Sequence, residues 1–116
     1  IKTKYDQLKN SSKNTKYDES KEYDDLDILL SIVKDLNLNM KFAILPANGK
    51  WSDYTGIDSE KRQVAYNNLK EIAKKNNIEV MDYSSKEYED YYMYDAMHLG
   101  WRGWIDFERD LYKLKK

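Results

Sequence analysis

The sequence contains no cysteine, a single proline, four glycines and one histidine among its 116 residues. The absence of cysteine excludes thiol catalysis, disulfide bonds and thiolate metal sites. Every apolar stretch is shorter than the roughly 20 residues that a membrane-spanning helix needs. The net charge is −1 and no basic stripe is present, so nucleic acid is not expected as a partner.

The one histidine, His98, ends the stretch Asp95-Ala96-Met97-His98. Histidine has an ordinary pKa of about 6.5, so it can take up and release protons near neutral pH. A neighbouring carboxylate can fix its tautomer and stabilise the imidazolium, as in a Ser-His-Asp triad. The same spacing also occurs in ordinary surface pairs and at helix ends. The surrounding sequence must therefore decide between a catalytic and a structural role.

Hydrophobic periodicity predicts helices and strands in alternation. Apolar residues at three- and four-residue intervals predict helices over 22–37 and from about 58 to 76. Short apolar runs predict a strand over 41–45, buried on both faces, and a less buried strand over 78–82. A last helix is predicted from about residue 100, with a buried side formed by Trp101, Trp104, Ile105, Leu111 and Leu114.

Three segments lack this periodicity. Residues 1–20 are polar and are predicted to be a linker or a strap over a surface. Residues 46–56 are predicted to be a turn followed by an aromatic loop. The tyrosine-rich acidic segment 83–94 is predicted to be a loop with one helical turn.

The element order helix-strand-helix-strand-helix predicts an α/β layer with parallel strands. Two strands form too small a sheet to cover three helices, and parallel sheets are normally covered on both faces. We therefore predict that residues 21–116 are the C-terminal portion of a larger domain with a doubly wound parallel sheet. Residues 1–20 are expected to lie outside this unit.

The predicted loops converge on one edge of this sheet. Ligands of open α/β sheets bind beyond the carboxyl ends of the strands. The first strand leads into Pro46-Ala47-Asn48-Gly49, and the second leads into the loop that carries Asp95 and His98. This placement favours the catalytic interpretation, with His98 as general base and acid and Asp95 as its orienting carboxylate.

Asn48 has two interpretations. Its side-chain amide can stabilise an oxyanion or contact a substrate, or it is simply the first residue of an Asn-Gly turn. The nearby aromatic residues likewise either pack loops or line a groove for a polyol or sugar-like polymer. The candidates for such a groove are Trp51, Tyr54 and Tyr92.

Two kinds of catalytic group are missing from the sequence. Scattered carboxylates such as Asp82, Asp90 and Asp95 do not form a compact acidic motif, so neither a metal nor a cofactor is predicted. No serine lies on a Gly-Asp-Ser or Gly-x-Ser-x-Gly turn between a strand and a helix. A serine nucleophile should therefore lie upstream, and the 116 residues alone are not expected to be catalytically competent.

Three stretches are more distinctive than Asp-x-x-His alone: EYDDL at 22–26, LPANGKWSDYTG at 45–56 and MYDAMHLGWRGW at 93–104. Together they resemble the C-terminal part of the DltD family of Gram-positive teichoic acid D-alanylation. The resemblance covers about residues 20–115. It also implies an SGNH-hydrolase-like fold, of flavodoxin-like order, in which Asp-x-x-His supplies two members of the triad.

The resemblance implies a cellular setting as well. A DltD-like protein has an N-terminal membrane anchor, absent here, and its domain lies on the extracytoplasmic face of the cell membrane. Its expected partners are lipoteichoic acid and a D-alanyl donor, which is either a carrier protein or a membrane acyltransferase. The expected reaction is D-alanyl ester transfer through a serine, with His98 as base and Asp95 as its orienting residue.

Two other functions remain open. A different SGNH esterase, acting on cell-wall or carbohydrate esters, would carry the same Asp-His pair. A non-catalytic module that binds teichoic acid or a membrane partner would retain the pair only as a vestige. An upstream Gly-x-Ser block with a membrane span favours the DltD-like function, and the lack of any serine turn favours the binding module.

Overall fold

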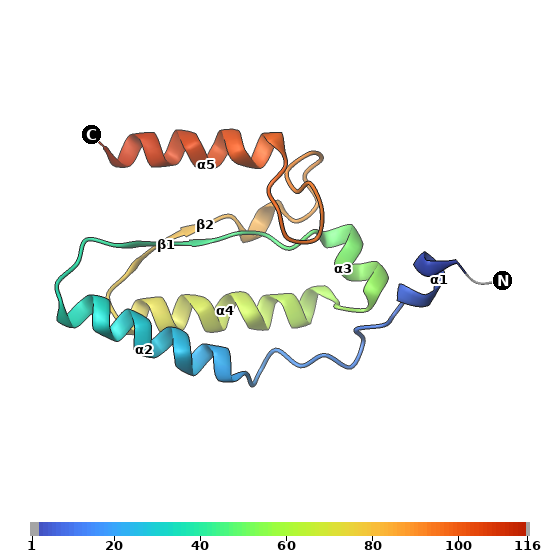
Figure 1. Cartoon of the computed structure of the whole chain (residues 1–116), viewed down its shortest axis with the longest axis horizontal. Helices are drawn as coiled ribbons and strands as arrows, with labels where there is room; N and C mark the ends of the chain where they lie inside the picture. The colour runs from blue at the N-terminus through green and yellow to red at the C-terminus, as the bar shows by residue number, and fades with distance from the viewer. Residues whose placement is uncertain (1–2, 116) are drawn as a thin grey trace.

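The computed structural model describes residues 3–115 and contains a two-stranded sheet with helices on both sides (Figure 1). A 3₁₀ turn, η1, follows the second strand. In chain order the elements are α1 (Lys4–Leu8), α2 (Lys21–Asp35), β1 (Lys41–Ile44), α3 (Gly49–Thr55), α4 (Ser59–Lys75), β2 (Glu79–Asp82), η1 (Ser84–Lys86) and α5 (Trp101–Leu114).

The two strands are parallel, as predicted, and pair from Lys41 opposite Glu79 to Ile44 opposite Asp82. Helices α3 and α4 lie in the connection between them. Helices α2 and α4 lie on one side of the sheet and α5 lies on the other (Figure 1). The predicted α/β class is therefore confirmed. The larger doubly wound sheet and the boundary at residue 20 remain predictions.

Single residues explain where α4 begins and where α2 and α4 end. The Asp58 carboxylate accepts a hydrogen bond from the Lys61 backbone N–H at 2.9 Å and starts α4. Just beyond the ends of α2 and α4, Asn37 and Asn77 have φ values of 54° and 57°. Asparagine tolerates this left-handed conformation, so it stops a helix almost as glycine does.

Each face of the sheet contacts its own apolar cluster. Neighbouring strand residues point to opposite faces, so Phe42 and Val80 face one cluster whereas Ala43 and Met81 face the other. The buried residues of the first cluster, on the α2 and α4 side, are Leu30, Val33, Ala73 and Ile78. Those of the second are Tyr83, Tyr92 and Leu99.

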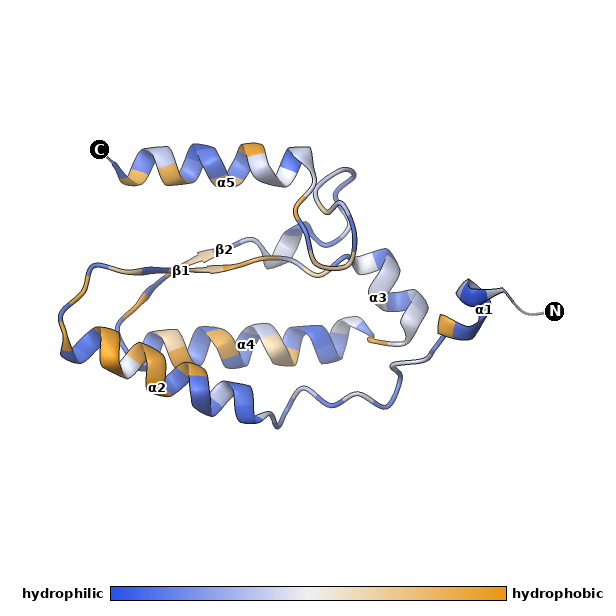
Figure 2. Cartoon of the chain, in the orientation of Figure 1, coloured by the Kyte–Doolittle hydropathy of each residue, from blue (hydrophilic) through white to orange (hydrophobic). Residues whose placement is uncertain are grey.

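The predicted buried side of α5 is wrong. Trp101 and Ile105 are 59% and 55% exposed, and Trp104, Leu111 and Leu114 are also exposed. The helix instead turns Gly103 and Phe107 toward the second cluster. Figure 2 shows apolar residues recurring along α5 and α2. A two-stranded sheet is too narrow to cover all of them, which is why Leu29 in α2 and Leu36 at its end are exposed too.

Two segments predicted to lack structure contain short helices. The predicted loop after Gly49 is helix α3, which ends at Gly56 with a φ of 96°. Helix α1 lies within the segment predicted as a linker or strap and begins with a capping box between Thr3 and Asp6. Within residues 3–115, no helix is both long and apolar enough to cross a membrane.

Candidate active site

Asp95 and His98 lie in a short loop whose two sides are joined. Met93 and Leu99 form an isolated antiparallel bridge, and the Tyr94 N–H donates to the His98 carbonyl at 2.8 Å. Inside the loop the Asp95 Oδ1 accepts from the backbone N–H groups of Met97 and His98, each at 2.8 Å. The carboxylate is thereby turned toward the ring of His98.

The carboxylate of Asp95 contacts the imidazole directly. Its Oδ2 lies 2.9 Å and its Oδ1 3.0 Å from Nδ1 of His98. The Met97 N–H, the His98 side chain and the His98 N–H together lower the pKa of Asp95 to about 2. An ionised Asp95 favours the tautomer of His98 that carries its proton on Nδ1, leaving Nε2 as the proton acceptor. Nε2 has no hydrogen-bond partner among residues 3–115.

A cleft of about 400 Å³ adjoins this pair. It is lined by residues from three distant parts of the sequence: Tyr5, Asn48, Trp51, Asp95, Ala96, Met97 and His98. The sheet-edge argument expected the loops after β1 and β2 to meet, and here they do. Tyr5 was not expected, because it lies in the segment predicted to be a linker or strap.

The side chain of Asn48 links the two loops. Its Oδ1 accepts from the Trp51 N–H at 3.2 Å and caps α3, and its Nδ2 donates to the Asp95 carbonyl at 3.4 Å. Asn48 is therefore a helix cap rather than the first residue of a simple turn. An amide nitrogen carries two hydrogens, so Nδ2 can still donate to a ligand in the cleft.

The three aromatic candidates lie in different surroundings. Trp51 lines the cleft. Tyr54 stacks at a tilt beside Trp51, 5.9 Å between ring centroids, and its hydroxyl donates to the Tyr5 carbonyl at 2.6 Å. Tyr92 is only 1% exposed and packs with Tyr83 and Leu99. The expectation that Tyr92 lines an open groove is therefore corrected.

A buried ionic network beneath Asn48 was not anticipated. Arg62 is 3% exposed, and its Nε donates to Glu87 at 2.7 Å while Nη1 donates to Asp53 at 2.8 Å. Nη2 donates to the Tyr88 hydroxyl at 2.8 Å. Burial alone would lower the pKa of Arg62, but the hydrogen bonds to Asp53 and Glu87 outweigh it and raise that pKa.

The network holds the polypeptide on both sides of Asn48. Tyr66 donates its hydroxyl proton to Glu87 at 2.8 Å, and its oxygen accepts from the Ala47 N–H at 2.7 Å. The Gly49 N–H donates to the Glu87 carbonyl at 2.9 Å. The available sequence signal was Arg62 itself, a charged residue one helical turn from Tyr66 on the buried side of α4.

The carboxylates weighed as metal ligands are engaged elsewhere. Asp82 pairs with Lys70 at 2.7 Å, and Asp90 lies 3.9 Å from Lys50. In the described part of the chain, no three acidic or histidine side chains converge in a way that could hold a metal ion.

The family model that matches this chain and three of its relatives all carry the name DltD. The model of the family described as DltD protein matches residues 1–116. Protein DltD of Bacillus subtilis (strain 168) is 35% identical over 119 residues, covering 100% of this chain and 30% of the relative. Protein DltD of Staphylococcus aureus (strain NCTC 8325 / PS 47) is 33% identical over 97 residues, covering 84% of this chain and 25% of the relative. That of Lacticaseibacillus rhamnosus is 32% identical over 110 residues, covering 94% and 26%. The chain thus spans less than a third of each relative's length.

Proposed function

The chain belongs to the DltD family, and on that premise we propose that it forms the C-terminal part of a longer SGNH-like protein that transfers D-alanyl esters onto lipoteichoic acid. Its contribution is the acid and base of a Ser-His-Asp triad, His98 and Asp95. The serine lies in sequence upstream. The longer protein acts on the extracytoplasmic face of the membrane, to which an N-terminal segment anchors it.

His98 moves the protons of this transfer. Nε2 takes the proton of the serine hydroxyl as the serine oxygen bonds to the acyl carbon, and gives it to the departing group of the D-alanyl donor. A hydroxyl of the teichoic acid then attacks the acyl-serine and gives its proton to Nε2, from which the serine oxygen recovers it. Asp95 remains ionised and stabilises the imidazolium in both halves.

The observation that carries this proposal is the contact of the Asp95 carboxylate with Nδ1 of His98 at 2.9 Å, at the edge of an open cleft. Both residues line this cleft, which an ordinary surface ion pair does not require. Asn48 supports the same function, because its second amide hydrogen can stabilise the oxyanion that develops on the carbonyl oxygen of the acyl group.

The test uses His98→Ala and Asp95→Ala in the full-length protein, with D-alanyl ester in the cell wall as the readout. Both variants should lose most of the ester because each removes one member of the same catalytic triad. Asp90→Asn is the matched control, because Asp90 is an exposed carboxylate of the same connection that does not line the cleft. Normal ester levels in folded His98→Ala and Asp95→Ala proteins would refute the proposal.

A non-catalytic teichoic-acid-binding module is the second candidate. One observation favours it: no serine is among the residues that line the cleft in the described part of the chain. In such a module His98→Ala would leave ester levels normal but weaken binding of teichoic acid. An SGNH esterase acting on other cell-wall or carbohydrate esters remains the alternative if D-alanyl ester levels are unaffected while ester hydrolysis is lost.

A further inference from the structure

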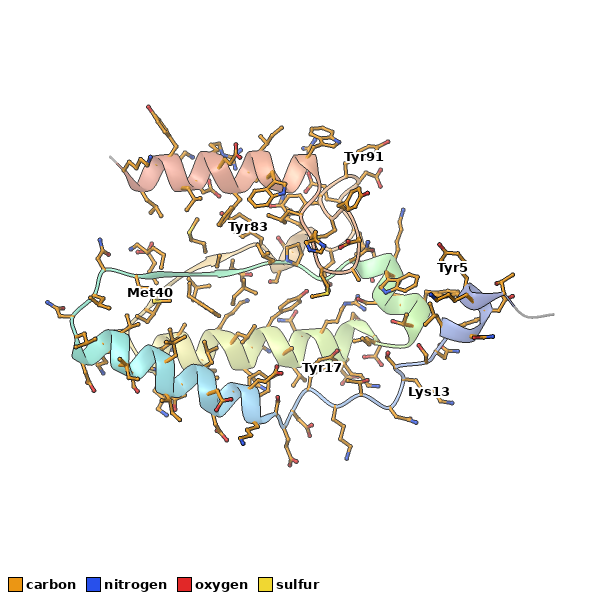
Figure 3. All side chains as sticks on the ribbon, in the orientation of Figure 1. Tyr5, Lys13, Tyr17, Met40, Tyr83 and Tyr91 are labelled. Carbon is orange, nitrogen blue, oxygen red and sulfur yellow. The ribbon has the colours of Figure 1, made fainter. Side chains whose placement is uncertain are left out.

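A second cavity, of about 410 Å³, adjoins the cleft. Trp51 and Ala96 line both spaces. One wall of this cavity comes from residues 8–17, and the opposite walls come from α3 and from the first half of α4. Figure 3 shows Tyr17, one of its lining residues, between the extended N-terminal segment and α4.

Backbone hydrogen bonds hold residues 8–17 over this cavity. The Asn10 N–H donates to the Tyr54 carbonyl at 2.9 Å, and the Ser12 N–H donates to the Thr55 carbonyl at 2.7 Å. At Gly56, a Cβ atom would lie 2.9 Å from the Lys13 Cα, so only glycine lets the segment approach this closely. The cavity is therefore bounded by fixed walls.

Apart from Arg62, the polar side chains that line the cavity carry neutral hydroxyls. Ser52 is 8% exposed, and its hydroxyl has no hydrogen-bond partner among the described residues. Ser12 and Tyr17 add further hydroxyls from the N-terminal segment. The Ser52 hydroxyl is therefore available to hydrogen-bond a ligand that enters the cavity.

The charge of Arg62 does not favour an anion here. Arg62 lines the cavity, but Asp53 and Glu87 already bind its guanidinium and together carry one more negative charge than it neutralises. All three of its guanidinium nitrogens already donate to Asp53, Glu87 and Tyr88, so Arg62 offers an entering phosphate no unpaired nitrogen. The site therefore disfavours the phosphodiester units of a polyol phosphate chain.

The remaining walls are apolar and include Leu8, Ile57, Ala65 and the indole of Trp51. An aromatic plane beside several neutral hydroxyls suits a ligand with both C–H faces and hydroxyl groups. We propose that this cavity binds one uncharged sugar unit, and that Trp51 separates it from the unit presented to His98. The link to His98 rests on the proposed function, whereas the binding site does not.

Binding can be tested with methyl α-D-glucopyranoside and sn-glycerol 3-phosphate as probes. The ¹⁵N-labelled full chain is titrated while the amide signals of Ser52 and Ala65 and the indole N–H of Trp51 are followed. The glucoside should shift these signals saturably, and glycerol phosphate should bind at least tenfold more weakly. No saturable shift with the glucoside, or equal binding of both probes, would overturn the proposal.

Variants locate the site. Ala65→Phe fills the cavity and should weaken glucoside binding at least tenfold, whereas the matched control Ala65→Ser should bind normally. Ser52→Ala should weaken it several-fold, and Ser85→Ala, an exposed serine of η1, should not. If Ala65→Phe does not fold, Ser52→Ala decides; unchanged affinity in a folded Ser52→Ala protein places the glucoside elsewhere and overturns the proposal.

The same titration separates this inference from the catalytic proposal. His98→Ala removes the proposed base without changing the cavity, so it should bind the glucoside as the unaltered chain does. Normal binding together with normal D-alanyl ester levels in that variant would refute the triad and leave the sugar site standing. If His98→Ala loses the D-alanyl ester but the unaltered chain does not bind the glucoside, the triad is supported and the sugar site is refuted.

Discussion

Arg62 and Glu87 form a buried ion pair, 2.7 Å between Nε and Oε2, at the point where α4 meets the connection between β2 and α5. Through Tyr66 and its own carbonyl, Glu87 also holds the backbone of Ala47 and Gly49. Asn48 lies between them and reaches the Asp95 loop. The candidate site thus rests on an ion pair that takes no part in its chemistry.

Arg62→Leu should lower the free energy of unfolding by about 3–5 kcal/mol, because it leaves the carboxylates of Asp53 and Glu87 without their cation. Urea denaturation measures the change. Arg109→Leu, which breaks only exposed pairs with Asp106 and Asp110, should cost under about 1 kcal/mol. Equal costs for the two variants would mean that the buried network contributes no more than a surface pair.

Tyr66→Phe should cost about 1–3 kcal/mol, because the Ala47 N–H loses its acceptor inside the protein. Hydrogen exchange at Ala47 should become faster, and this local effect distinguishes a lost hydrogen bond from general loosening. Tyr94→Phe serves as the control, since Tyr94 is well exposed. Unchanged exchange at Ala47 would show that the hydroxyl of Tyr66 does not hold this loop.

The carboxyl group of Asp95 should titrate near pH 2 in the folded chain and near its ordinary value of about 3.9 in urea. Its pKa is lowered on folding. The ionised carboxylate therefore stabilises the loop above about pH 4, and this contribution disappears as the pH falls through about 2. Side-chain ¹³C NMR measures both midpoints. Identical midpoints in the two states would contradict the hydrogen-bonding described for the loop.

Gly103→Ala should destabilise the protein by about 1–3 kcal/mol, although alanine is the better helix former. A Cβ atom at this position would lie 2.5 Å from the Tyr92 carbonyl oxygen, so α5 would have to move away from the second cluster. Thermal unfolding provides the measurement. Glu108→Ala, at an exposed position of α5, should be nearly neutral, and a stabilised Gly103→Ala variant would show that α5 has room to shift freely.

Helices α2, α4 and α5 could be predicted from the sequence because each has 14 or more residues and a clear apolar periodicity, and the strands could be predicted from their short apolar runs. Helix α3 could not, since one cap at Asn48 and seven residues give almost no periodic signal. Periodicity also identifies residues that share a face of a helix, but it does not say whether that face meets the sheet or the solvent. This is why the prediction of which side of α5 is buried was wrong. In the site, Asp95 and His98 could be paired because they are close in sequence. The contributions of Arg62 and Glu87, 25 residues apart, depend on tertiary packing.

The bridge between Met93 and Leu99 makes the Asp95–His98 pair a preorganised unit. Its ends are fixed a few residues apart, so aligning the carboxylate with the ring requires little further loss of chain entropy. Movements of α5 or of the loop that carries Asn48 would move the two side chains together as one body. Such a pair can approach a nucleophile supplied by another part of a protein without losing its own internal geometry.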